Sequence, residues 1–158
     1  MKILVLGVLG FLMVFSAFPA AFATSSVPFN GSGTGTFTDT SPTTVLIIGT
    51  GYYDHLGLTT LRFPSTITGQ AACVGGFTAT EQDDYTSSSG DSVFLTVHDT
   101  ICPTSIPNAF QLTGSFTVTG GTGRFIDASG SGTVHASVTF TSATSGTFSG
   151  TQAGTITY

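Results

Sequence analysis

Residues 130–140 read Gly-Ser-Gly-Thr-Val-His-Ala-Ser-Val-Thr-Phe, and this stretch decides the fold. Every second residue is glycine or apolar, ending with Val134, Ala136, Val138 and Phe140, and the residues between them are Ser, Thr and His. Side chains on a β-strand alternate between two faces, whereas a helix would mix the two sets. The stretch therefore predicts a β-strand with one face on a core and the other in water.

Other parts of the chain have the same character. Residues 147–158 alternate in the same way, with Phe148, Ile156 and Tyr158 on one face. Thr and Gly dominate elsewhere, and both are typical of twisted strands and tight turns rather than helices. Segments bounded by turn residues predict further strands at 34–38, 43–50, 58–63, 74–81, 93–99 and 110–119.

About eight short strands with hairpin-length links predict an all-β fold, either an antiparallel β-barrel or a two-sheet β-sandwich. The barrel is favoured for two reasons. Small inward residues suit a tapering interior, and closure of the sheet removes exposed strand edges.

The first 23 residues have the features of a cleavable signal peptide. Lys2 is followed by an uncharged apolar run at 3–18, and Ala-Phe-Ala at 21–23 supplies the small-x-small pattern of a cleavage site. The run is shorter than the roughly 20 residues of a membrane-spanning helix. We therefore expect a signal-peptide helix, cleavage after Ala23, a single domain at 24–158 and no stable membrane insertion after cleavage. The destination is then the extracellular space or the periplasm.

Cleavage also changes the charge of the chain. Arg62 and Arg124 become the only Lys or Arg residues against eight Asp and Glu, which gives a formal net charge of −6. A domain this acidic repels polyanions such as nucleic acids. We therefore expect no nucleic-acid partner, and the residues leave the oligomeric state open.

Two cysteines remain after cleavage, Cys73 and Cys102. In an oxidising compartment, an isolated pair most simply forms one disulfide. A hairpin turning near residues 87–88 would bring the two together, because their positions are symmetric about that turn. A reactive dithiol or a metal pair is disfavoured because there is no CxxC spacing.

The segment around residue 54 contains candidate ligand-binding residues. Tyr53, Asp54 and His55 lie together shortly before Arg62. Such polar groups near a strand start fit the mouth of a barrel, where ligand contacts gather. The competing interpretation is a solvated loop in which Asp54 forms a turn.

A Gly-rich stretch at 119–125 contains the fifth candidate, Arg124. The stretch lacks the Gly-Lys-Ser/Thr ending of a phosphate loop, and a strand rather than a helix is expected after it. We therefore expect a tight turn in which Arg124 bonds to carbonyl groups or pairs with an acid such as Asp127.

Other chemistry has no clear signature. The chain has no HxH, HExxH or GxSxG motif, so we expect no metal and no cofactor, and we identify no catalytic residue. Glu81, Asp83, Asp84 and Asp91 cluster near the predicted hairpin tip but match no calcium-binding loop. The cluster is therefore interpreted as a solvated, charged tip.

Several short motifs carry a resemblance to a known group of proteins. They are His55-Leu56-Gly57, Gly-Gly-Thr-Gly-Arg-Phe at 120–125, Ala128 with Gly-Ser-Gly-Thr at 130–133, and Gly-Thr-Ile-Thr-Tyr at 154–158. Together they resemble small secreted bacterial β-barrel proteins that are similar to the allene oxide cyclase and dirigent barrels. The resemblance covers roughly residues 50–158. It implies a barrel whose lumen takes hydrophobic substrates, and it assigns no catalytic residue.

Two functions remain open from the sequence. The favoured one is a secreted, non-catalytic barrel that binds a small apolar or amphipathic molecule, or that acts in the cell envelope or matrix. The alternative is a cyclase or isomerase that works inside the lumen. Inward-facing acids together with Arg62 or Arg124 would favour the enzyme, whereas arginines paired with surface acids would disfavour it.

Overall fold

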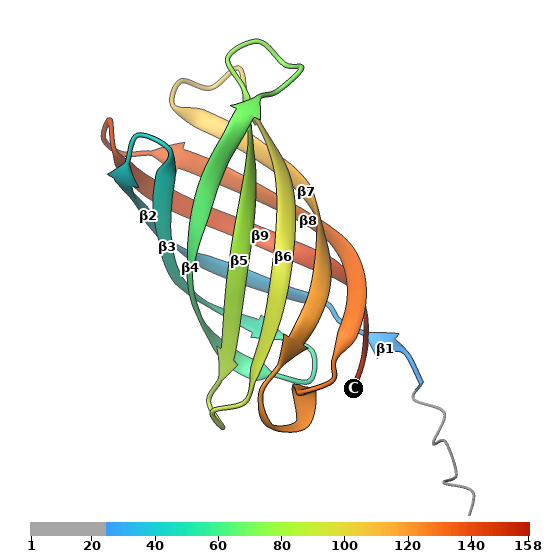
Figure 1. Cartoon of the computed structure of the whole chain (residues 1–158). Coiled ribbons are helices and arrows are strands. Elements are labelled where there is room, and N and C mark those ends of the chain that lie inside the picture. Colours follow the sequence, from blue (N-terminus) through green and yellow to red (C-terminus); the bar gives the residue numbers. More distant parts are fainter. Residues whose placement is uncertain (1–24) are drawn as a thin grey trace, which may run out of the picture.

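The computed structural model describes residues 25–158, which form a closed antiparallel β-barrel (Figure 1). Each barrel strand pairs with its neighbours in the chain, and the last strand pairs with both the preceding strand and the first, which closes the barrel. The eight strands are β2 Gly31–Ser41, β3 Thr44–Tyr53, β4 Gly57–Gln70, β5 Phe77–Ser87, β6 Ser92–Pro103, β7 Ala109–Gly121, β8 Ser129–Phe140 and β9 Ser145–Thr157.

The predicted all-β barrel is therefore confirmed, and the sandwich alternative is wrong. A two-residue strand, β1 Val27–Pro28, adds to the end of β9 beside β2. The predicted signal peptide at 1–23 lies outside the described residues. No helix within residues 25–158 is long and apolar enough to cross a bilayer.

The two faces predicted for residues 130–140 are also confirmed. Val134, Ala136 and Val138 line the barrel interior, whereas His135 and Ser137 are exposed. On the adjoining strand β9, Phe148 faces the interior in the same way. The alternation of residue types thus sets which side chains enter the barrel, because each strand has one face on either side of the wall.

Glycines on the inner face make room for large side chains from other strands. A Cβ atom at Gly132 would lie 2.5 Å from the ring of Phe116, and one at Gly154 would lie 2.7 Å from it. Real Cβ contacts are longer than this, so only glycine leaves space for the fully buried Phe116 ring. The inward glycines are therefore packing partners of the aromatic core.

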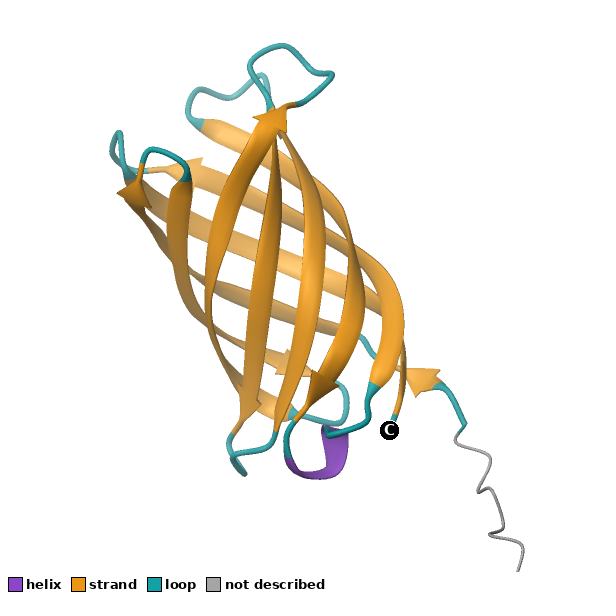
Figure 2. Cartoon of the chain, in the orientation of Figure 1, coloured by secondary structure: helices purple, strands orange, loops and turns teal. Residues whose placement is uncertain are grey.

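One end of the barrel is closed by side chains. A short 3₁₀ helix, η1 Gly123–Phe125, follows β7 at this end and is the purple segment in Figure 2. Phe125 of η1, Phe29 and Ile156 are completely buried there. The expectation that a strand follows the Gly-rich stretch at 119–125 is confirmed, because η1 lies within that stretch and β8 is the next element. Gly123 has a φ of 56°, which starts this turn and which other residues rarely adopt.

The opposite end, at the β4–β5 and β6–β7 loops, carries a row of phenylalanines. The Phe37 and Phe140 ring centroids are 4.8 Å apart, those of Phe140 and Phe110 are 5.4 Å apart, and those of Phe110 and Phe77 are 6.2 Å apart. Phe77, Phe110 and Phe140 are only half-buried, so this row presents an apolar rim to solvent.

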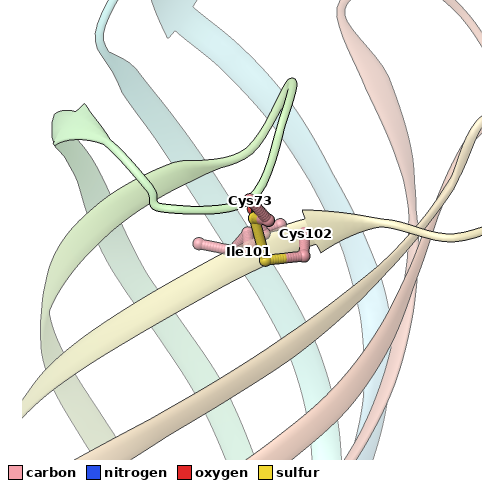
Figure 3. The surroundings of a disulfide bond; sticks show 3 residues. All are labelled: Cys73, Ile101 and Cys102. Carbon is pink, nitrogen blue, oxygen red and sulfur yellow. A yellow bond between two sulfur atoms is a disulfide. The ribbon is translucent and has the colours of Figure 1, made fainter.

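The predicted disulfide between Cys73 and Cys102 is present, with the two Cα atoms 6.0 Å apart. Figure 3 shows that it joins the β4–β5 loop to the end of β6. The hairpin register is different from the prediction. Phe77 pairs with Ile101 and Thr86 with Ser92, so the β5–β6 turn is centred on residue 89 and Cys73 lies before the strand.

The predicted strand at 74–81 therefore begins too early. Val74 is 95% exposed in the loop, and β5 runs instead from Phe77 to Ser87. The predicted strand also ends too early, because the acidic run that begins at Glu81 has the composition of a turn although it forms part of the barrel wall.

Candidate functional site

A cavity of about 120 Å³ lies inside the barrel. Its size is comparable to that of cavities that hold a single six-membered ring, at roughly 150 Å³. Apolar and aromatic side chains make most of its wall. They include Phe37, Val45, Ile47, Leu61, Phe63, Val97, Leu112, Val134, Val138 and Phe148.

Three carboxyl groups face this cavity. Glu81 and Asp83 lie on β5, and Asp99 lies on β6. Their residues are only 7%, 3% and 3% exposed, respectively. Glu81 of β5 pairs with Ser65 of β4. Asp99 of β6 pairs with Ala79 of β5, which lies two residues before Glu81. The three acids therefore line one side of the lumen.

This arrangement corrects the interpretation of the acidic cluster as a solvated tip. Asp84 is exposed on the outer face of β5, and Asp91 lies outside the cavity near Arg124. Glu81 and Asp83, in contrast, share the inward face with Ala79 and Tyr85. The period-two rule, applied along β5, would have predicted this face. The predicted strand ends at Glu81, so the alternation from Glu81 through Asp83 to Tyr85 falls outside it.

Burial changes the acidity of all three carboxyl groups. Burial raises the pKa of Glu81 to about 8, and the charge of Asp99 adds to the rise while a hydrogen bond from Ser65 opposes it. Burial also raises the pKa of Asp99 to about 7. The pKa of Asp83 is raised well above its ordinary value by burial and then by the charges of Glu81 and Asp99. The cluster therefore holds protons near neutral pH.

Two tyrosines adjoin the carboxyl groups. The ring centroids of Tyr53 and Tyr85 are 4.6 Å apart, and both residues line the cavity. Tyr85 counteracts part of the rise in the pKa of Asp83. Burial raises the pKa of Tyr53 to about 12, so this phenol stays neutral and able to donate.

Several polar atoms in the cavity wall have no hydrogen-bond partner. They are Oδ1 of Asp83, both carboxyl oxygens of Asp99, and both side-chain amide atoms of Gln152. Gln152 is 5% exposed and enters from β9, whereas the acids enter from β5 and β6. A buried polar group without a partner typically costs about 1–3 kcal/mol. These atoms therefore mark places where a bound molecule would complete the hydrogen bonding.

The cavity wall has no basic group. Among the described residues that line it, there is no Lys, Arg or His. Within residues 25–158, no three His, Cys, Asp or Glu side chains are grouped so that they could hold a metal ion.

The structure separates the five residues that the sequence suggested as ligand contacts. Tyr53 lines the cavity, but Asp54, His55 and Arg124 lie together at the closed end of the barrel. Arg62 is exposed on the outer face of β4, between two buried residues. Of the five, only Tyr53 is therefore in contact with the lumen.

The residues at the closed end hold the chain in place. The Asp54 carboxylate accepts hydrogen bonds from the backbone and side-chain amides of Asn30, at 3.0 and 3.1 Å. The His55 ring donates from Nε2 to the Pro28 carbonyl oxygen at 3.0 Å. Both contacts fasten the segment that contains β1 to the β3–β4 loop.

Arg124 completes this closed end. Its guanidinium group donates to the carbonyl oxygen of His55, and its Nε lies 3.8 Å from Oδ2 of Asp91. It also lies 4.8 Å from the centre of the Phe125 ring. The predicted bond to a carbonyl is confirmed, but the acid beside Arg124 is Asp91 rather than Asp127, because the chain turn brings β6 and η1 together.

The chain matches no protein-family model, no curated protein and no solved structure.

Proposed function

We propose that this protein is an exported, non-catalytic β-barrel that binds a small apolar or amphipathic molecule in its lumen. The observation that supports the proposal is a mostly apolar cavity whose wall contains buried polar atoms without partners. Ligand sites typically combine an apolar lining with a few polar groups that orient the ligand. The row of phenylalanines lies at the end of the barrel opposite η1 and provides an apolar entrance to the same lumen.

A cavity-filling substitution tests the binding proposal. Ala136 lines the cavity, and its neighbour Ser137 points outward from the same strand. We expect Ala136→Leu to weaken the binding of benzyl alcohol by about tenfold or more. The reason is that excluding two ligand carbons from burial costs roughly 0.8 kcal/mol each. Isothermal titration calorimetry measures the affinity.

The control is Ser137→Leu, which adds the same side chain outside the barrel and should leave the affinity within about twofold of the wild type. Native mass spectrometry of protein purified from culture supernatant should also show a co-purifying small molecule. The proposal fails if the wild type binds no single-ring probe and carries no ligand. Equal affinity in both variants would place the binding site outside the lumen.

The proposed export has a separate test. The segment 1–23 has a signal-peptide pattern, and cleavage after Ala23 would leave Thr24 as the first residue. We expect mass spectrometry of protein from culture supernatant or periplasm to show this N-terminus. An intact Met1 on the exported protein would contradict the prediction. Confinement of the protein to the cytoplasm would contradict it as well.

A second candidate function is a cyclase or isomerase, which the resemblance to the allene oxide cyclase and dirigent barrels implies. One observation favours it. Protonated carboxyl groups face the cavity, and a raised pKa suits a general acid near neutral pH. Another observation disfavours the enzyme: Arg62 and Arg124 both lie away from the cavity, and Arg124 lies beside a surface acid. Turnover of the bound molecule by the wild type would favour this alternative.

A further inference from the structure

The hydrogen-bonding capacity of the cavity wall indicates the kind of ligand. The partnerless oxygens are Oδ1 of Asp83, both carboxyl oxygens of Asp99 and Oε1 of Gln152, whereas Nε2 of Gln152 is the one partnerless nitrogen. A protonated carboxyl group donates one hydrogen bond and still accepts others, and an ionised one only accepts. The wall therefore offers mainly acceptors and calls for a ligand that is rich in donors.

Charge points to the same kind of ligand. Three acids face the cavity, and within the described chain no base faces it with them. An anionic ligand would meet no positive charge among the described residues of the cavity wall, and every carboxyl group that ionised would repel it strongly in a low-dielectric interior. A cation would meet the carboxyl groups on one side of the lumen. Tyr53 and Tyr85 also line the cavity, and aromatic rings of this kind attract cations.

The fold keeps the Asp99 carboxyl group in the lumen. Gly114 of β7 is the cross-strand partner of Asp99, and a Cβ atom at this position would overlap Oδ1 of Asp99. The titratable groups near Asp99 on the same side of the lumen are Glu81, Asp83 and Tyr85 from the adjacent strand β5. Tyr53 from β3 also lines the cavity. The adjoining part of β7 adds no titratable group, because its residue here is glycine.

We infer that the lumen binds a small apolar primary amine in its ammonium form, with the ammonium group on Asp99, whose two carboxyl oxygens both lack partners in the described structure, and the apolar body in the rest of the cavity. An ammonium group has three donors and no acceptor, which fits a wall rich in acceptors. The cavity of about 120 Å³ limits the apolar body to about one ring. This inference rests on the proposed binding function and narrows it to one class of ligand.

Binding of the cation is coupled to loss of a proton. In the empty cavity the carboxyl groups are protonated near neutral pH, because burial disfavours their charged form. An ammonium ion favours the carboxylate, so its binding releases a proton to solvent. The affinity for the amine should therefore rise with pH between about 6 and 8, by up to tenfold per pH unit for each proton released.

Two ligands of similar shape test the inference. Benzylamine and benzyl alcohol differ in the charged group, and calorimetry at pH 8 compares their affinities for the whole exported chain. We expect benzylamine to bind about tenfold more tightly or better, because charge-assisted hydrogen bonds are stronger than neutral ones. Titration in two buffers with different ionisation enthalpies at pH 7 should show about half a proton or more released per benzylamine and none per benzyl alcohol, because Asp99 with a pKa of about 7 is half protonated at this pH.

Matched variants locate the interaction. Asp99→Asn should reduce the preference for benzylamine and leave the affinity for benzyl alcohol within a few-fold of the wild type. Asp83→Asn should have a smaller effect on the preference, because Asp83 lies four residues along β5 from Ala79, the cross-strand partner of Asp99. Asp84→Asn is the control, since Asp84 adjoins Asp83 in the chain but faces outward. The proton count uses the wild type alone, so it remains decisive if a variant does not fold.

The outcomes separate this inference from the proposed function. If benzyl alcohol and benzylamine bind equally, or if no proton is released, the amine inference is wrong and the binding function stands. If neither probe binds, both are overturned. A preference for benzylamine that persists in Asp99→Asn would also overturn the assignment to Asp99.

Discussion

Raising the pH from about 5 to 8 is expected to destabilise the folded protein. Glu81 and Asp99 have ordinary pKa values of 4.5 and 3.8 when exposed, and burial raises these pKa values to about 8 and 7 in the fold. Between the two sets of values, the folded state binds more protons than the unfolded state. The stabilising effect of protonation is therefore complete below pH 4 and is lost as the pH rises through the folded pKa values. The expected slope is about 1.4 kcal/mol per pH unit for each such group.

Urea denaturation between pH 4.5 and 8.5 at constant ionic strength measures this slope. Replacing Glu81 with Gln should flatten it by about 1.4 kcal/mol per pH unit. The same change should make the protein more stable than the wild type at pH 8, by on the order of 2 kcal/mol. The exposed Asp84→Asn variant should follow the wild-type profile. A free energy of unfolding that rises with pH over this range would show that the lumen carboxyl groups are ionised in the fold.

Loss of the disulfide is expected to have the second large effect. Cys73 and Cys102 are 29 residues apart in the chain, and cross-links that close loops of this length typically stabilise a fold by about 3–4 kcal/mol through the unfolded state. The double variant Cys73→Ser/Cys102→Ser should therefore lose about this much free energy of unfolding. Chemical reduction of the wild type should give a matching loss.

A substitution in the same loop provides the control. Val74 follows Cys73 and is almost fully exposed, so Val74→Ser should change the free energy of unfolding by less than about 0.5 kcal/mol. If the double variant loses less than about 1 kcal/mol, the β4–β5 loop is not part of the cooperative folding unit. Equal effects of the double variant and Val74→Ser would lead to the same conclusion.

The candidate site was only partly predictable from the sequence. The sequence predicts Tyr53 as a ligand contact, and Tyr53 does line the cavity. The reason for that prediction is its place beside Asp54 and His55, which lie at the closed end instead. The sequence pattern predicts that Glu81 and Asp83 lie in a solvated loop tip, whereas both side chains face the cavity. Acidic residues are rare inside proteins, so composition alone favours the solvated interpretation. Glu81, Asp83 and Tyr85 are spaced two residues apart on β5, and this spacing is what indicates that both acids face the lumen.

Asp99 and Gln152 had weaker signals. Asp99 alternates in step with Leu95, Val97 and Ile101, so its inward direction can be deduced once β6 is assigned. Gln152 shares its strand face with Phe148 and Ile156, so the alternation places it inward, but its nearest neighbours on that face are glycines. It became a candidate only through its burial and its partnerless amide group.

The sequence by itself determined the strand faces and the cysteine pairing. Both depend on local properties, namely the period of two along a strand and the presence of two cysteines in residues 24–158. Only the tertiary structure decided which inward residues share one cavity. Closure of the barrel brings side chains from β3, β5, β6 and β9 to a single lumen, and the register between distant strands sets their neighbours. The raised pKa values follow from that closure, because the surrounding strands remove the carboxyl groups from water.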